Sequence, residues 1–145
     1  MAEKCWPVAA PADVPDCRRK HRRTGHVWPM LSFPQSARLS NPEDYRRVFD
    51  SPAFKVSSAA FLLLAQHAGN SRSRIGVIVA KKHVKLATRR NRLKRLVREQ
   101  FRLNLFHPSL DLVVLARSAA DSMDNAQVTN DLEQLWAKLQ KKASA

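Results

Sequence analysis

Apolar positions recur at helical spacing in three stretches of this chain. Residues 42–50, 86–105 and 125–141 carry hydrophobic side chains three and four positions apart, which predicts three amphipathic helices. Ser40 and Glu43 have the spacing of a capping box at the start of the first helix. Each helix has one apolar face, so each is expected to pack against another part of the protein.

Continuous apolar stretches between these helices predict strands. Residues 57–66 and 74–81 are two such stretches, and the polar segment 67–71 between them predicts a turn, so we expect a hairpin. A third strand is predicted at 110–116. The order helix, strands, helix, strand, helix is typical of a single-domain α+β sandwich, in which helices pack on one sheet.

The N-terminal part of the chain has a different character. Residues 1–34 hold five of the eight prolines and the basic cluster 18–23, without sustained periodicity. We therefore predict a disordered basic extension over 1–32, followed by one folded domain over 33–142. Met30 directly precedes the change in character, so a second interpretation is that residues 1–29 are an overlong gene start.

Charge narrows the class of partner. The net charge is +14, and residues 72–102 hold twelve Lys or Arg against a single acid. Such a cluster attracts polyanions, and composition alone does not separate RNA from DNA or from an anionic membrane surface. The longest apolar run, 59–65, is too short to span a bilayer, and the first residues do not resemble a secretory signal, so we expect a cytoplasmic protein.

The basic side chains are concentrated on one predicted helix. Residues 89–102 contain seven Lys or Arg and one acid, with apolar residues on one side and Asn91, Arg95, Arg98 and Arg102 on the other. A helix face exposed only to solvent usually mixes both signs of charge, whereas this one would repel itself without an anionic partner. The pattern favours contact with nucleic acid.

The basic helix and the strand before it together resemble a known family. The strand RIGVIVAKK at 74–82, followed by RNRLKRLVRE at 90–99, is similar to the protein subunit of bacterial ribonuclease P, and the similarity covers about residues 33–140. It implies an αβββαβα sandwich, a fold shared with a domain of a ribosomal protein. It also implies a left-handed βαβ crossover, which general handedness rules would not predict.

The resemblance also implies a function. The chain would assist a catalytic RNA in removing the 5′ leader from precursor tRNA, binding the leader and stabilising the active RNA and its metal ions, with one protein per RNA. Mg²⁺ would serve the RNA-containing holoenzyme, and the protein alone would bind no metal or cofactor. The sequence agrees on one point, because it shows no catalytic constellation of its own.

Site residues follow from the family pattern position by position. Arginines and lysines suit phosphate contact, and aromatic rings can stack on bases of any sequence. From spacing alone, the aromatic pair on the first helix is more typical of a core than of a binding cleft. The side chains expected to face the catalytic RNA are Lys81, Arg92, Arg95, Arg98 and Arg102. The side chains expected to contact the leader or precursor tRNA are Tyr45, Phe49, Leu62, Leu64, Lys82, Arg90, Asn91 and Lys94.

Other functions remain as alternatives. A ribosomal or other structural RNA-binding protein would share the charge and the α+β pattern, but would not be expected to combine the paired-lysine strand with the Arg-Asn-Arg helix. A helix-turn-helix DNA-binding regulator is disfavoured, because a strand precedes the basic helix. Zinc binding is disfavoured because Cys5 and Cys17 are too far apart in sequence for a zinc hook.

Overall fold

The computed structural model describes residues 33–104, 106 and 108–145. The predicted extension over 1–32, with both cysteines, lies outside the described residues. Among the helices of the described part, none is both long and apolar enough to cross a bilayer.

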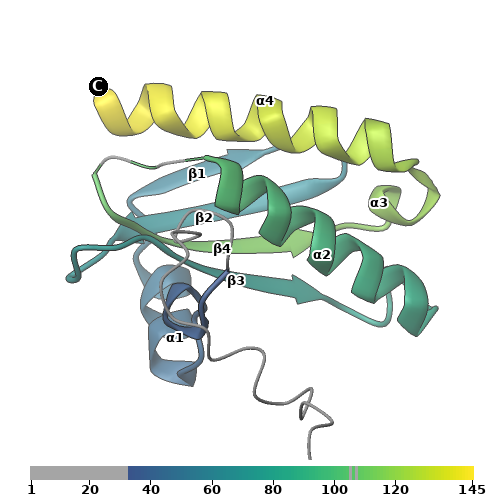
Figure 1. The fold of residues 1–145 in the computed structure, drawn as a ribbon, viewed down its shortest axis with the longest axis horizontal. Helices are drawn as coiled ribbons and strands as arrows, with labels where there is room; N and C mark the ends of the chain where they lie inside the picture. The colour runs from purple at the N-terminus through teal and green to yellow at the C-terminus, as the bar shows by residue number, and fades with distance from the viewer. Residues whose placement is uncertain (1–32, 105, 107) are drawn as a thin grey trace, which may run out of the picture. The chain divides into compact units, whose positions relative to one another are not determined.

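The described residues form an α+β fold with one four-stranded sheet (Figure 1). The elements in chain order are a 3-10 helix η2 (Gln35–Ala37), α1 (Pro42–Asp50), β1 (Phe54–Ser57), β2 (Phe61–His67), β3 (Arg74–Val79), α2 (Ala87–Leu103), β4 (Leu110–Ala116), α3 (Ala119–Ser122) and α4 (Asn125–Ser144).

The strand order β1-β2-β4-β3 contradicts the predicted hairpin. Most of the predicted strand 57–66 lies in β2, and β1, which ends at Ser57, precedes it and pairs with it antiparallel. Among the strands, β3 pairs only with β4, in parallel. Six of the seven residues of β4 are buried, so this strand is suited to a central position between two neighbours. Because β4 lies between β2 and β3, residues 67–71 connect two strands that do not pair.

The connection from β3 through α2 to β4 is left-handed. In Figure 1 the arrows of β3 and β4 both point to the right, α2 returns to the left in front of the sheet, and β4 lies above β3. Nearly all such crossovers in proteins are right-handed. The structure therefore confirms the fold implied by the family resemblance.

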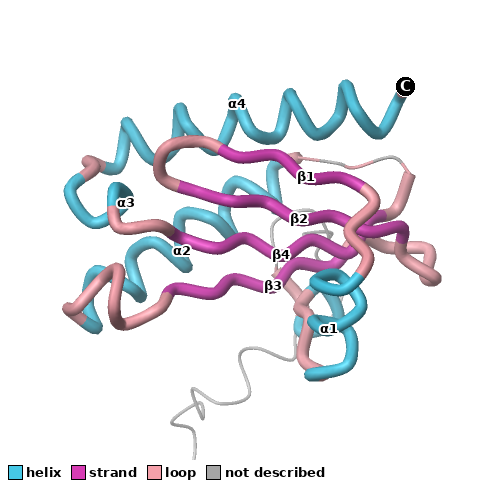
Figure 2. Tube along the Cα trace, turned by 180° about the vertical axis from the view of Figure 1, so that it is seen from behind, coloured by secondary structure: helices cyan, strands magenta, loops and turns pink. Residues whose placement is uncertain are grey.

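Helices lie on both faces of the sheet. Helices α2 and α4 cover one face and bury the main core, whereas α1 lies on the opposite face, as Figure 2 shows from behind. The largest buried side chains of the main core include Trp136, Phe61, Leu63, Leu93, Leu110, Leu112, Leu132, Leu135 and Leu139. A smaller cluster of Leu39, Val48, Leu64 and Val113 lies beneath α1.

Helix boundaries agree with the sequence to within three residues, and α2 ends at Leu103. The predicted capping box of α1 is not formed, because Asn41 is the N-cap and its side chain makes no capping hydrogen bond. A capping box instead starts α4, between Asp124 and Gln127. Helix α4 continues to Ser144, and the short helix α3 was not predicted.

Arg74 attaches α1 to the sheet. Its guanidinium donates two hydrogen bonds to the Asp111 carboxylate of β4, at 2.9 and 2.7 Å, and a third to Asp44 of α1 at 2.9 Å. Both carboxylates are buried, and hydrogen bonding to Asp111 raises the pKa of Arg74. The paired charges determine where α1 lies, because α1 has only a small apolar face of its own.

Replacing Arg74 by alanine should destabilise the domain. Arg74→Ala leaves two buried carboxylates without a partner, and we expect the free energy of unfolding to fall by about 2–3 kcal/mol. Arg72→Ala is the matched control, because Arg72 is exposed and lies outside the four ion pairs of the described residues. Urea denaturation of both variants measures the difference. Equal stability of the two would contradict the anchoring role of Arg74.

Candidate RNA interface

Helix α2 presents a basic flank beside its buried face. Leu93, Val97 and Phe101 are buried in the main core, one turn apart. Asn91, Lys94 and Arg98 follow one another at spacings of three and four residues, so they form a second stripe along the helix. We call Asn91, Lys94, Arg95 and Arg98 the basic flank, and Arg95 is its most outward-facing member.

Arg98 lies where α2, α1 and the segment before α1 meet. Burial lowers the pKa of the Arg98 guanidinium, and the nearby charge of Arg38 lowers it further. Burial raises the pKa of the Tyr45 hydroxyl, an effect that the charge of Arg98 partly offsets. The charges of Arg38 and Arg98 therefore act on each other, and that of Arg98 acts on the Tyr45 hydroxyl. Among the described residues no carboxylate pairs with Arg38 or Arg98. Such a site favours an anion.

Other arginines of α2 have partners within the protein. Arg89 pairs with Asp121 of α3 at 3.1 Å, and Arg92 donates to the Met123 carbonyl at 2.9 Å. The Arg90 guanidinium donates to the carbonyls of Val84 and Lys85, at 3.0 and 2.7 Å. Arg102 pairs with Glu99, one turn away on the same helix.

These contacts divide the predicted RNA-facing residues into two sets. Arg92 and Arg102, expected to face the catalytic RNA, each have a partner within the protein, as does Arg90 from the predicted leader set. Arg95 and Arg98 have no carboxylate partner among the described residues.

Lys81 and Lys82 lie in the turn between β3 and α2, and both are exposed. The turn is closed by the Ala80 carbonyl, which accepts hydrogen bonds from the backbone N–H groups of His83 and Val84 at 3.1 Å each. The two lysines are therefore attached to a well-defined turn at the end of β3, just before the helix that carries the basic flank.

The face of the sheet that carries α1 is only partly covered. Strand pairing aligns Leu62, Leu115 and Ile78 in one row across β2, β4 and β3, and all three are half-buried. Tyr45 of α1 packs against the same small cluster as this row, and Phe49, one turn further along the helix, is 41% exposed. We call these five residues the apolar trough, with the row as its floor and the two aromatic rings as its wall.

Leu64 does not line this trough. It is 6% exposed and belongs to the small cluster beneath α1. The structure therefore brings Tyr45, Phe49 and Leu62 together from the predicted leader-binding set and places Leu64 under the helix. Ile78 and Leu115 were not predicted, because only the strand order shows which residues share a row with Leu62. Arg38 was not predicted either, because its place beside Ile75 of β3 depends on the folded structure.

Tyr45 reaches its place because β3 has a glycine below it. A Cβ atom on Gly76 would lie 2.5 Å from the Tyr45 ring. Gly76 is buried, and its neighbour Ile75 pairs with the segment before α1 through a 3.0 Å hydrogen bond from the Leu39 N–H to the Ile75 carbonyl. The ring thus lies directly on the strand backbone, close to the edge of the sheet.

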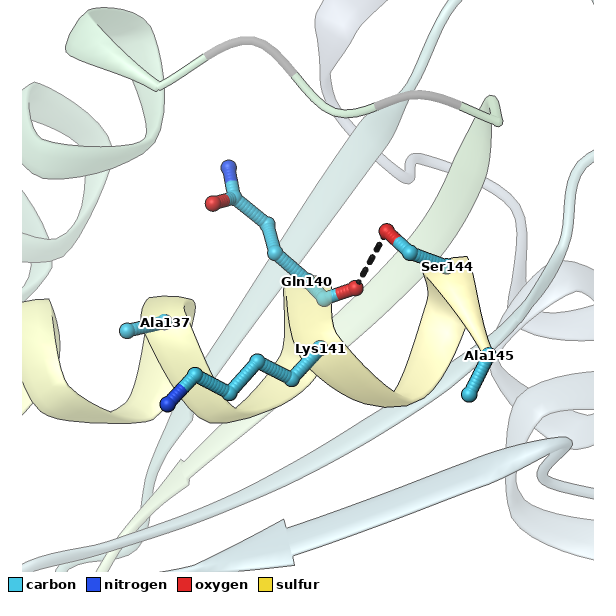
Figure 3. Close-up of a pocket in the computed structure, with 5 residues that line it drawn as sticks. All are labelled: Ala137, Gln140, Lys141, Ser144 and Ala145. Carbon is cyan, nitrogen blue, oxygen red and sulfur yellow. Dashed lines mark hydrogen bonds between the residues drawn. The ribbon is translucent and has the colours of Figure 1, made fainter.

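A catalytic or metal site is not found in the described part of the chain. No three His, Cys, Asp or Glu side chains there converge in a way that could hold a metal ion. A shallow depression runs along the end of α4, where the Ser144 hydroxyl donates to the Gln140 carbonyl and Lys141 supplies the one charged side chain (Figure 3). These groups do not include a pair suited to acid–base chemistry.

Comparison with known proteins agrees with this geometry. The sequence profile of the Ribonuclease P family matches residues 33–140. The chain belongs to the ribonuclease P protein family. The ribonuclease P protein component of Marinobacter nauticus is 46% identical over 112 residues, covering 77% of this chain and 85% of that protein. The Acinetobacter baylyi component is 44% identical over 115 residues, covering 79% and 88%.

Solved structures of family members share the fold. The Staphylococcus aureus ribonuclease P protein, at 27% identity, superposes with a TM-score of 0.65 and covers 72% of this chain and 95% of that one. The Thermotoga maritima ribonuclease P protein, at 32% identity, gives 0.61 and covers 72% and 96%. The mixed sheet with packed helices is therefore the fold of this ribonuclease P family.

Gly76→Ala should displace Tyr45 from the sheet. The added methyl group would overlap the ring, and we expect a loss of about 1–3 kcal/mol in the free energy of unfolding. Gly69→Ala is the matched control, because a Cβ there meets no atom within 4 Å. Thermal or urea unfolding of the two variants compares them. A Gly76→Ala protein as stable as Gly69→Ala would show that the ring does not rest on the strand.

Proposed function

We propose that this chain is the RNA-binding subunit of ribonuclease P and assists a catalytic RNA in removing the 5′ leader from precursor tRNA. The observation that supports this most strongly is the basic flank of α2. Lys94, Arg95 and Arg98 have no carboxylate partner among the described residues, although other arginines of the same helix do. Unneutralised guanidinium and ammonium groups on a rigid helix suit the phosphates of a folded RNA.

The basic flank would bind the catalytic RNA without reading its sequence. Arginine offers forked donors to phosphate oxygens, and lysine offers a mobile positive charge. Arg95 faces outward, and the exposed lysines at 81 and 82 extend the same positive surface beyond the start of the helix. Arg92 and Arg102 would contribute less to RNA contact, because Arg92 donates to the Met123 carbonyl and Arg102 pairs with Glu99.

The apolar trough would hold the single-stranded leader. Tyr45 packs with the leucine and isoleucine side chains of the floor, and Phe49, one turn later on α1, has an exposed ring, so unpaired bases can stack on these rings. Stacking needs no particular base, which suits a leader whose sequence varies between substrates. Lys82, Asn91 and Lys94 would contact the leader backbone, while Arg90 would mainly support the turn before α2.

The chemistry would belong to the RNA. In this proposal Mg²⁺ ions act in the complex of protein, catalytic RNA and precursor tRNA, and the protein stabilises the RNA that holds them by neutralising nearby phosphates. Each chain offers one basic flank and one apolar trough, so we propose one protein per RNA.

Removing two charges from the basic flank should weaken assembly with the RNA. For Arg95→Ala with Arg98→Ala, we expect affinity for the catalytic RNA to fall about tenfold or more, and the slope of log affinity against log salt to decrease by about two. The control is Lys138→Ala with Lys141→Ala, which removes the same charge from exposed positions on α4. Binding is measured over a salt series, and precursor tRNA cleavage at low Mg²⁺ with and without protein.

Two outcomes would contradict the assignment. One is unmodified protein that gives no stimulation of precursor tRNA cleavage by the cognate RNA at low Mg²⁺. The other is an equal loss of RNA affinity in the α2 and α4 double variants, which would show that only net charge matters.

Phe49→Ala should weaken binding of precursor tRNA and spare mature tRNA. Loss of one stacking partner is expected to cost about 1–3 kcal/mol of leader binding. The control is Leu103→Ala, which removes an exposed apolar side chain outside the trough. Affinities of the reconstituted holoenzyme for both RNAs measure the effect. An equal loss for precursor and mature tRNA would exclude leader contact at Phe49.

A further inference from the structure

The sheet has two edges, and β1 forms one of them. Among the strands of the described residues, β1 pairs only with β2, from Phe54 opposite Ala65 to Ser57 opposite Leu62. In an antiparallel pair, alternate residues turn their backbone N–H and C=O groups away from the partner strand. At a sheet edge these outward groups can pair with a strand of another molecule, so an edge strand needs some form of cover.

Two hydrogen bonds show which residues of β1 face outward. The Ser58 N–H donates to the Phe61 carbonyl at 2.8 Å, which makes these two residues a hydrogen-bonded pair at the start of the hairpin. Alternation along the ladder then turns the backbone groups of Ser57 and Lys55 away from β2. In agreement with this, the Lys55 carbonyl accepts a 3.0 Å hydrogen bond from the ammonium of Lys142, which lies 87 positions later in the chain.

Lys142 belongs to the C-terminal end of α4, which runs alongside β1 in both views (Figures 1 and 2). Leu139 is buried in the main core and Ala143 packs against that core, so the end of α4 is held next to β1. The family profile matches residues 33–140 and thus ends just before Lys142. The residue that covers the edge therefore lies outside the matched part of the chain.

The outward groups of β1 fit a second copy of the same strand. With a two-fold axis at Val56, Lys55 of one copy lies opposite Ser57 of the other, and each such pair exchanges two backbone hydrogen bonds. This register also keeps the two lysine side chains from lying directly opposite each other. The Lys55 carbonyl that has to accept a hydrogen bond in this pairing is the one that Lys142 occupies.

We propose that Lys142 blocks the β1 edge against pairing with a second copy of this chain. The net charge of +14 keeps free copies apart, but salt or a bound polyanion screens that repulsion. The hydrogen bond from Lys142 acts at contact distance and does not depend on long-range repulsion. Its effect is therefore greatest where the charge of the protein has been neutralised and several copies gather on one anionic polymer.

The test measures self-association of the full chain by sedimentation, at low salt and at about 0.5 M salt, where the screening length is only about 4 Å. At the higher salt concentration, Lys142→Ala should associate about tenfold more tightly than the unmodified protein. Lys142→Arg should behave as the unmodified protein, because a guanidinium can donate to the same carbonyl. Lys138→Ala is the matched control, because it removes the same charge from an exposed position on α4.

A second substitution shows whether the copies meet through β1. Ser57→Pro removes an outward N–H that the pairing needs and leaves the hydrogen bonds between β1 and β2 in place. Lys142→Ala combined with Ser57→Pro should therefore return to the self-association of the unmodified protein. Urea unfolding of each variant checks that it is folded. Amide hydrogen exchange at Lys55 and Ser57 in Lys142→Ala needs no proline variant, and it should slow when the copies associate.

Three outcomes would overturn the proposal. The first is a Lys142→Ala protein that associates no more tightly than Lys138→Ala. The second is association that a folded Ser57→Pro variant leaves unchanged, because the copies would then meet through another surface. The third is hydrogen exchange at Lys55 and Ser57 that does not change when Lys142→Ala associates.

Discussion

The paired charges of Arg74, Asp44 and Asp111 hold α1 against the sheet, and the proposed RNA site depends on that position. Helix α1 supplies the aromatic wall of the apolar trough and brings the Tyr45 hydroxyl within reach of the charge of Arg98. Its own apolar contacts are few, because the cluster beneath it is small. The close approach of Tyr45 to Gly76 adds a steric limit. The position of the apolar trough's aromatic residues therefore depends both on the ion pairs of Arg74 and on the glycine at position 76.

The position of α2 in the crossover lets one side of this basic helix pack in the main core while another side stays accessible to a ligand. Its apolar face closes the main core, and one side of the helix is joined to α3 and the segment after it by Arg89 and Arg92. The opposite side carries Lys94 and Arg98 toward the β3 edge. Internal partners thus hold the helix in position, while the basic flank stays without carboxylates and is free to meet phosphates.

The local pattern of apolar residues was enough to predict most helices and strands. It was not enough to predict which strands pair with each other. The apolar spacing in 42–50 and 110–116 predicted α1 and β4 with the observed bounds, because each stretch buries its own residues. The hairpin prediction was wrong because β4, distant in sequence, pairs between β2 and β3. The same dependence on strand order separates Leu62, which lines the trough, from Leu64, which is covered by α1. Internal partners of arginines likewise depend on the folded geometry.

The two sets of charges in this protein differ in how far solvent reaches them. The Arg74 side chain is 18% exposed and its carboxylate partners 10–11%, so mobile ions screen their attraction weakly. Arg95 of the basic flank is exposed to solvent, and at 0.15 M ionic strength the screening length is only about 8 Å. In the proposed complex, concentrated salt would therefore weaken the phosphate contacts of Arg95 more than the ion pairs that anchor α1. On this proposal the RNA can be released while α1 stays attached to the sheet.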